Sequence, residues 1–234
     1  MNGLPLPPLQ SDRVQLEVVP PYSGAALRRR PLQRPIKRAF DIIASLMLIL
    51  LMLPMVLVVA AAVVIDSPGP IFFVQRRVGR LGAEFPLLKF RTMVADGEAA
   101  LAERVASDVE LLREWERSRK LRNDPRVTRV GTFLRRHSID EMPQLINVLR
   151  GDMSLVGPRP VRTDEIAYFG ERALEILGAR PGLTGLWAVS GRSDLTYEER
   201  AGLEYRYVAD WNLWLDVRVL MRTIPVVVRG RGAY

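Results

Sequence analysis

The hydrophobic pattern of the chain is dominated by one uninterrupted apolar run, residues 42–65, which contains no charged residue. As a helix this run would be about 36 Å long, enough to cross a hydrocarbon core of about 30 Å. Asp41 precedes it and Asp66 follows it. Because an acid at the bilayer centre costs roughly 2.5–3.5 kcal/mol, these aspartates should mark the edges of the membrane. The run starts too far along the chain for a cleavable signal peptide, so we predict a membrane helix.

Pro54 lies near the middle of the run. Proline lacks an N–H and crowds the preceding turn, so it kinks or breaks a helix. A kinked helix could still span the membrane, because a lone proline is tolerated there. Alternatively, the helix breaks into two arms of roughly 18 Å and returns to the same face. Residues 28–38 carry six basic residues, and Arg76, Arg77 and Arg80 follow the run. Basic flanks stay in the cytoplasm, so the charges favour the re-entrant form.

The rest of the chain predicts a mainly α fold with a small β hairpin. Alternating residues predict strands over 71–78 and 84–90, joined around Gly79–Gly82. Apolar residues at helical spacing predict an amphipathic helix over 99–121. Further helices are predicted over 132–136, 141–149, 163–177 and 197–223, with loops over 157–160 and 180–192.

These patterns divide the chain into three regions. Residues 1–35 carry seven prolines without periodicity and should form a disordered cytoplasmic tail. Residues 36–68 form the membrane helix, which the prolines and glycine of 66–70 end. Residues 69–234 form a small cytosolic domain associated with the membrane. The clustered tyrosines and tryptophans of the last helix belong either to the core or to amphipathic helices lying along the membrane surface.

The composition of the chain limits which ligands and which kinds of catalytic or metal site it can have. The net charge is +8, with 34 basic and 26 acidic residues mostly interspersed. This charge suits an anionic membrane surface and phosphate-bearing ligands, and we expect no nucleic-acid binding. The absence of cysteine excludes disulfides, thiolate metal sites and a cysteine nucleophile. His137 is the only histidine, which excludes multi-histidine metal sites.

The densest cluster of polar residues, 135–144, contains the adjacent acids Asp140 and Glu141. Spacing alone leaves two interpretations open. In one, Ser138 and Glu141 form a capping box, or Asp140 is the N-cap of a helix with Pro143 in its first turn. In the other, one carboxylate attacks phosphorus while its neighbour holds a divalent cation.

Several basic residues could support the second interpretation. Arg135 and Arg136 could clamp phosphate oxygens in a bidentate manner. Lys89 and Arg91 should share one face at the end of the hairpin. Arg159 stands between two prolines, which fix the backbone on both sides. The alternative for each is an ordinary solvated side chain.

Together these segments resemble one family, the bacterial sugar transferases or monotopic phosphoglycosyl transferases, which start exopolysaccharide and glycan assembly. The resemblance covers roughly residues 36–234, and the motifs are specific by their order rather than singly. They are 37–41 (KRAFD), 69–73 (GPIFF), 89–93 (KFRTM), 124–128 (DPRVT), 134–145 (LRRHSIDEMPQL), 157–160 (GPRP) and 180–185 (RPGLTG).

The resemblance implies transfer of sugar-1-phosphate from a UDP-sugar to undecaprenyl phosphate, giving undecaprenyl-diphosphate sugar and UMP. It implies that Asp140 is the nucleophile of a covalent phosphosugar intermediate. Glu141, together with Asp140, would hold Mg²⁺. The phosphate-binding residues would be Lys89, Arg136 and Arg159. The sugar is expected to be galactose or glucose.

The resemblance also implies a re-entrant helix on the cytoplasmic face of the bacterial inner membrane, in contact with phospholipids. Relatives usually break this helix at a Ser-Pro pair, whereas this chain has Leu53 before Pro54. A homo-oligomer is possible in this family. The alternative function is a non-enzymatic, membrane-anchored scaffold that binds anionic lipid or a partner.

Overall fold

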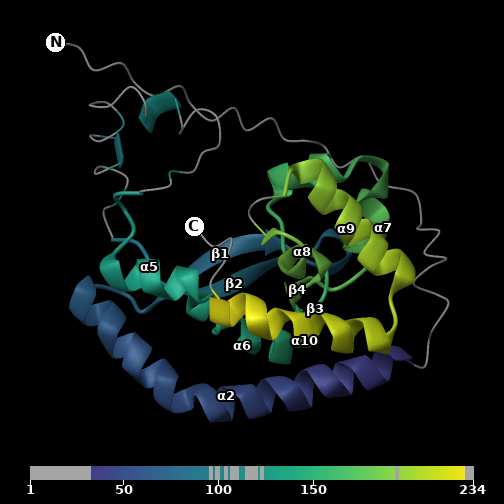
Figure 1. Ribbon diagram of the computed structural model, residues 1–234, viewed down its shortest axis with the longest axis horizontal. Helices are drawn as coiled ribbons and strands as arrows, with labels where there is room; N and C mark the ends of the chain where they lie inside the picture. The colour runs from purple at the N-terminus through teal and green to yellow at the C-terminus, as the bar shows by residue number, and fades with distance from the viewer. Residues whose placement is uncertain are drawn as a thin grey trace.

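A single long helix, α2 (Gln33–Asp66), runs along one side of the molecule (Figure 1). The computed structural model describes residues 33–94, 97, 101–102, 105, 111–113, 121, 124–192 and 195–229. The predicted tail therefore lies almost entirely outside the described residues, as does most of the predicted 99–121 helix. Helix α2 contains the only span in the described chain that is long and apolar enough to cross a membrane.

Helix α2 continues through Pro54 instead of ending there, so the expected break takes the form of a bend, and the re-entrant form stays a prediction. It remains helical from end to end with Pro54 inside it. Figure 1 shows it as two arms that meet at a bend. A single proline removes one backbone hydrogen bond and crowds one turn, which is enough to bend a helix without ending it.

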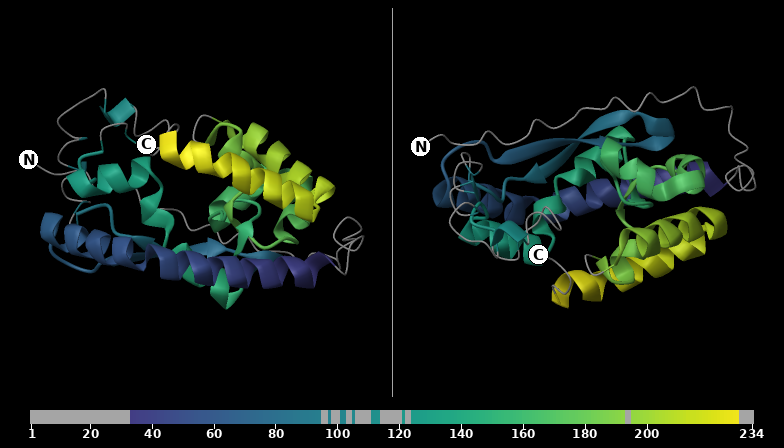
Figure 2. Two further views of the ribbon diagram at one scale, coloured as in Figure 1. Left: turned by 60° about the horizontal axis from the view of Figure 1, so that its bottom comes forward. Right: turned by 90° about the horizontal axis from the view of Figure 1, so that it is seen from above.

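The predicted hairpin is confirmed. Strands β1 (Phe72–Val78) and β2 (Glu84–Phe90) are antiparallel, with Phe72 opposite Phe90 and Val78 opposite Glu84. A 3₁₀ turn, η1 (Arg80–Gly82), joins them. Seen from above, the hairpin and the last two helices lie on opposite sides of α2 (Figure 2).

The remaining elements are short and follow one another closely. They are α5 (Arg129–Arg136), η2 (Ile139–Glu141), α6 (Gln144–Arg150), β3 (Ser154–Val156), η3 (Thr163–Arg172), α7 (Ala173–Leu177), β4 (Gly182–Thr184), α8 (Leu186–Val189), α9 (Tyr197–Asp210) and α10 (Leu213–Arg229). The described chain is thus mostly helical with two small sheets.

Two predicted helices are divided in the structure. The 163–177 segment is the 3₁₀ element η3 followed by α7, and Gly170 interrupts η3 with φ 52° and ψ −138°. The 197–223 segment ends at Asp210 and restarts at Leu213. There the Asn212 side chain accepts a hydrogen bond from the Leu215 N–H at 2.9 Å and so begins α10.

The region predicted as loop over 180–192 contains a strand and a helix. Strand β4 pairs in parallel with β3, with Ser154 opposite Gly182 and Val156 opposite Thr184. A Cβ atom on Gly182 would lie 2.0 Å from the Gly157 nitrogen, so the glycine is required by the close approach of the two segments. Strands of three residues are too short to show alternation, which explains why the pattern missed them.

Both arms of α2 pack against this domain. Ala44 and Ile49 of the first arm contact the core cluster around Leu87 and Val148, while Val59 and Val63 of the second arm pack with Phe90 and Leu134. The opposite surface of α2 exposes large apolar side chains, including Leu50, Leu51, Leu57, Val58 and Ile65.

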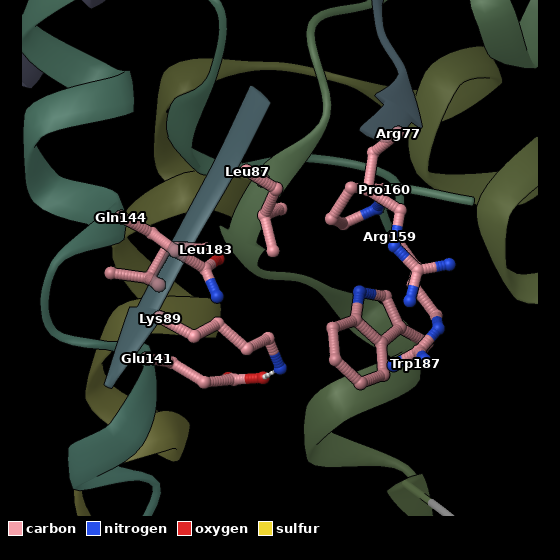
Figure 3. Close-up of a pocket in the computed structure, with 10 residues that line it drawn as sticks. Arg77, Leu87, Lys89, Glu141, Gln144, Arg159, Pro160, Leu183 and Trp187 are labelled. Carbon is pink, nitrogen blue, oxygen red and sulfur yellow. Dashed lines mark hydrogen bonds and ion pairs between the residues drawn. The ribbon is translucent and has the colours of Figure 1, made fainter. Parts of the chain in front are cut away.

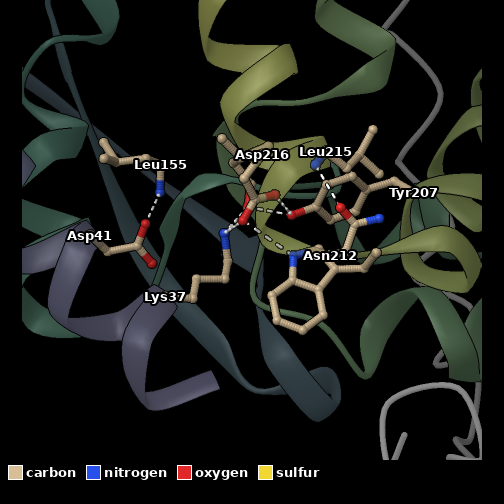
Figure 4. A network of polar contacts seen from close by, with 9 residues as sticks. Lys37, Asp41, Leu155, Tyr207, Asn212, Leu215 and Asp216 are labelled. Atoms are coloured by element: carbon tan, nitrogen blue, oxygen red, sulfur yellow. Dashed lines mark hydrogen bonds and ion pairs between the residues drawn. The ribbon is translucent and has the colours of Figure 1, made fainter. Parts of the chain in front are cut away.

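Polar contacts hold both ends of α2 to the same domain. At the first end, Asp41 Oδ1 accepts a hydrogen bond from the Leu155 N–H at 3.1 Å, and Lys37 pairs with Asp216 at 2.6 Å (Figure 4). At the second end, Asp66 accepts from the Val130 N–H at 2.9 Å. The two aspartates that flank the apolar run therefore both bind backbone amides of the domain.

Candidate active site

A pocket with about 300 Å³ of empty space, open to solvent, lies where the end of the hairpin meets η2, α8 and the loop after β3 (Figure 3). Its charged lining consists of Arg77, Lys89, Glu141 and Arg159, and Trp187 forms part of one wall. Three of its four charged lining groups are cationic, which suits a phosphate-bearing ligand.

The acidic pair occupies a tight turn rather than a regular helix start. Ser138 has a left-handed backbone, with φ 56°, and Asp140 and Glu141 follow in the 3₁₀ turn before α6. Neither the capping box nor the Asp140 N-cap forms, so these residues do not serve the capping roles considered from sequence. Instead, the Ser138 hydroxyl accepts a hydrogen bond from Arg192 at 2.6 Å.

Lys89 joins the two acids. Its ammonium group lies 2.8 Å from Glu141 Oε1 and 3.9 Å from Asp140 Oδ2. Burial acts to raise the pKa of Glu141, but the charge and hydrogen bond of Lys89 outweigh it and hold that pKa below its usual value. Glu141 is therefore ionised at neutral pH.

Asp140 behaves differently from its neighbour. It is buried, and burial followed by the adjacent Glu141 charge raises its pKa to about 6, against the opposing charges of Lys89 and Arg135. The carboxylate predominates at pH 7 but lies close to its titration point. A desolvated carboxylate of this kind is a stronger nucleophile than a solvated one.

Arg135 and Arg136, the two arginines before the acidic pair, have different environments in the structure. Arg135 donates through Nε to the Thr92 hydroxyl at 2.9 Å, and its charge favours the ionised form of Asp140. Arg136 is exposed at the end of α5 and does not line the pocket. Arg91 also lies outside the lining and is buried, donating to Ser67 and so attaching the end of α2.

Arg159 lines the opposite side of the pocket. Its backbone N–H donates to Glu204 Oε1 at 2.9 Å, and its guanidinium lies 5.3 Å from the ring centroid of Trp187. Two buried donors on these residues, Arg159 Nε and Trp187 Nε1, have no hydrogen-bond partner within the described part of the protein. Since buried donors are normally satisfied, they indicate a missing acceptor in this pocket.

Three residues of the site were missed from sequence. Arg77 lines the pocket from β1, and burial followed by the Arg159 charge lowers its pKa to about 10, which leaves it cationic. Trp187 belongs to a segment predicted as loop. Glu204 is fully buried on α9, where helical periodicity gave no sign of a charged residue facing inward.

The model for the family described as "Bacterial sugar transferase" matches residues 32–230. The chain belongs to the bacterial sugar transferase family. It is 44% identical over 216 residues to "Exopolysaccharide production protein ExoY" of Rhizobium meliloti (strain 1021), covering 92% of this chain and 94% of that protein.

Two further relatives carry names that state a reaction. The chain is 41% identical over 209 residues to "UDP-glucose:undecaprenyl-phosphate glucose-1-phosphate transferase" of Caulobacter vibrioides, covering 85% of this chain and 72% of the relative. It is 46% identical over 201 residues to "Undecaprenyl-phosphate galactose phosphotransferase" of Salmonella typhimurium, covering 86% of this chain and 42% of the relative. Family and relatives together make this sugar transferase an enzyme of the phosphoglycosyl transferase type.

The donor set of this sugar transferase fits a hard divalent cation. Magnesium in phosphoryl-transfer sites commonly uses one or two carboxylates and completes its shell with water and substrate phosphates. Glu141 lines the pocket, and the adjacent Asp140, which is not among the lining residues, lies 3.9 Å from Lys89, which does line it. Among the residues that the structure describes, no group of three or more His, Cys, Asp or Glu ligands gathers at this site or at any other, so substrate and water would have to complete the shell.

Proposed function

We propose that the protein transfers sugar-1-phosphate from a UDP-sugar to undecaprenyl phosphate, giving undecaprenyl-diphosphate sugar and UMP. The observation that carries this proposal is a buried Asp140 carboxylate beside Lys89 and Glu141, two residues that line a pocket together with Arg77 and Arg159. The family and the relatives' names give the reaction class, and the site supplies groups that suit each step.

In the first half-reaction, an Asp140 oxygen attacks the phosphorus that carries the sugar. The bond from that phosphorus to the bridging oxygen breaks, and UMP leaves with the electron pair. A covalent phosphosugar–aspartyl intermediate remains. Lys89, Arg159 and Arg77 reduce the charge repulsion between the anionic nucleophile and the diphosphate.

In the second half-reaction, an oxygen of undecaprenyl phosphate attacks the same phosphorus. The bond to Asp140 breaks, the carboxylate is regenerated, and the product is undecaprenyl-diphosphate sugar. The covalent intermediate lets the two substrates bind in the same pocket one after the other, so the small site need not hold both at once. Mg²⁺ held by Asp140 and Glu141 would supply further neutralisation of phosphate charge.

We also propose that α2 is re-entrant and seats the domain on the cytoplasmic face of the bacterial inner membrane. Hydrogen bonds and packing connect both ends of α2 to one domain, which supports an entrance and an exit on the same side. A soluble nucleotide sugar and a lipid phosphate can react only where cytosol and membrane meet.

The reaction is tested by UMP release from a panel of UDP-sugars with undecaprenyl phosphate and Mg²⁺. We expect release with UDP-galactose or UDP-glucose, the sugars of the relatives' names, and trapping of radiolabelled phosphosugar on the wild-type protein when the lipid is omitted. No release with any UDP-sugar would favour the scaffold alternative.

The topology has a convenient test because the chain lacks cysteine. Single cysteines replace Asp12 before the helix and Arg76 after it, and an impermeant thiol reagent is added to spheroplasts. We expect neither site to react until the cells are lysed, after which both react. Labelling of one site alone in sealed spheroplasts would mean that the helix spans the bilayer.

A further inference from the structure

A second pocket lies where the first arm of α2 meets η1 and the loop before β4. It holds about 610 Å³ of empty space, open to solvent, and none of its lining residues lines the pocket at Lys89. Its basic lining comes from segments far apart in sequence, namely Arg34, Lys37, Arg38, Arg80 and Arg180. We call it the α2 basic pocket.

Backbone carbonyls, rather than carboxylates, hold three of these arginines. Arg38 donates to the carbonyls of Val148 and Leu149 at 2.6 and 2.8 Å. Arg80 and Arg180 each donate through Nε to the carbonyl of a glycine, at 3.1 and 2.9 Å. A carbonyl fixes a guanidinium without neutralising it, and the Nε bonds of Arg80 and Arg180 do not use their terminal nitrogens.

The acids at the α2 basic pocket do not balance this charge. Asp216 is engaged by the Lys37 ammonium at 2.6 Å and by the Tyr207 hydroxyl at 2.7 Å (Figure 4). Asp41 lines the pocket and accepts the Leu155 N–H. The lining therefore holds four arginines and Lys37 against one carboxylate, Asp41, an arrangement that favours a bound anion.

The electrostatics of Arg180 reflect this crowding. Burial lowers its pKa, and the charges of Arg80 and Arg38 lower it further, while Asp41 acts in the opposite direction. The three guanidinium groups thus repel one another within the pocket. An anion placed among them would relieve that repulsion.

A buried hydroxyl gives an independent sign of a ligand. Ser154 lines the pocket, is 1% exposed, and its Oγ has no hydrogen-bond partner within the described residues. A buried hydroxyl normally has a partner, and a phosphate oxygen would be a suitable acceptor. Ser45 has the same unsatisfied hydroxyl but does not line this pocket, which makes it a matched control.

The position and the rest of the lining distinguish a lipid from a soluble phosphate. Lys37 and Arg38 directly precede the apolar run, and the exposed Phe40 and Ile43 follow them on α2. The remaining wall includes apolar and aromatic side chains, among them Val208 and Trp211. Basic pockets beside a membrane helix at the cytoplasmic surface bind lipid headgroups.

We propose that the α2 basic pocket binds the phosphate-bearing headgroup of an anionic phospholipid, with Arg38, Arg80 and Arg180 around the phosphate and the Ser154 hydroxyl donating to it. The site is separate from the transferase pocket and does not depend on the reaction proposed there. It would hold the first arm of α2 at the level of the headgroups.

The test uses the full chain in uncharged detergent and measures the melting temperature. The additives are dihexanoyl phosphatidylglycerol, dihexanoyl phosphatidylcholine and inorganic phosphate. We expect saturable stabilisation by phosphatidylglycerol alone. The double variant Arg80→Gln/Arg180→Gln should weaken binding and so raise the half-saturating concentration by about fivefold per arginine. Ser154→Ala should raise the half-saturating concentration severalfold. It should not lower the melting temperature without lipid, because the substitution removes an unsatisfied buried hydroxyl.

Matched variants identify the pocket responsible. Arg76→Gln removes an exposed arginine of β1, and Ser45→Ala removes the control hydroxyl. Lys89→Gln alters the transferase pocket. Each of these three variants should keep the stabilisation by phosphatidylglycerol. Equal stabilisation by phosphatidylcholine or inorganic phosphate would overturn the proposal. So would a response that survives the double variant and Ser154→Ala, or one that Lys89→Gln abolishes.

Discussion

Two basic pockets border the same domain. A buried aspartate lines one of them and another lies beside a lining residue of the second, but the two aspartates have different surroundings. Asp41 accepts a backbone hydrogen bond from Leu155 in the α2 basic pocket. Asp140 lies beside Glu141 and 3.9 Å from Lys89, with a pKa raised to about 6. A carboxylate engaged by the backbone stabilises the fold, whereas one kept desolvated beside a like charge is available for chemistry.

The largest expected effect on activity comes from substituting Asp140, and substituting Asp41 should affect stability instead. Asp140→Asn should reduce UMP release by on the order of 10³-fold or more, because the amide is not a nucleophile. It should raise the melting temperature at pH 7, since a carboxyl whose folded-state pKa is raised destabilises the folded protein above that pKa. Asp41→Ala should leave turnover per folded molecule near wild type but cost about 1–3 kcal/mol by leaving the Leu155 N–H unsatisfied.

Asp210→Ala is the control for both substitutions. Asp210 is exposed on α9 and lies 3.6 Å from Arg206, so its loss should change neither activity nor stability measurably. Calorimetry and UMP release on the three variants give the comparison. If Asp140→Asn retained near-normal release, the nucleophile would have to be another group.

A smaller effect is expected when only the cation between the two acids is removed. Lys89→Met should lower UMP release by about 10²-fold, since one preorganised positive charge is lost. Because Lys89 opposes the rise in the pKa of Asp140, its removal should move the acid limb of the pH–rate profile above its wild-type position near pH 6. The carboxylate is the reactive form, so activity falls as the pH drops through that value.

Lys89→Arg is the conservative control and should recover part of the rate with an acid limb near that of the wild type. Full pH–rate profiles of the three proteins make the measurement. An acid limb that stays in place in Lys89→Met would mean that another group controls it.

Sequence reasoning succeeded where a signal was local and strong. The helix over 42–65 and the hairpin were predicted from the printed residues, whereas the acidic pair, expected at a helix start, lies in the 3₁₀ turn before α6. The family resemblance, which rests on ordered motifs, was also confirmed by the family match. The assignments of Asp140, Glu141, Lys89, Arg136 and Arg159 to catalysis and phosphate binding stay predictions.

Sequence reasoning failed where tertiary contacts decide the outcome. The choice of Arg135 over Arg136 as the neighbour of Asp140 depends on how α5 is rotated, which its short sequence does not reveal. The β3–β4 pairing joins three-residue segments that only the fold brings together. Glu204 resembles any helical surface glutamate until α9 is packed against the Arg159 loop.

Glu204 provides the smallest and most selective prediction. Burial raises its pKa to about 8, although the Arg159 N–H and the charges of Arg159 and Arg200 act in the opposite direction. About nine in ten molecules are then protonated at pH 7, so Glu204→Gln should change activity less than about twofold. The folded state binds this proton more tightly than the unfolded state does, so the wild type should lose stability as the pH rises from the ordinary glutamate pKa of 4.5 to about 8, and the loss should level off above 8. Glu204→Gln should remove that loss. Melting temperatures from pH 4 to 10 test it, and parallel curves for the two proteins would show that Glu204 does not titrate in this range.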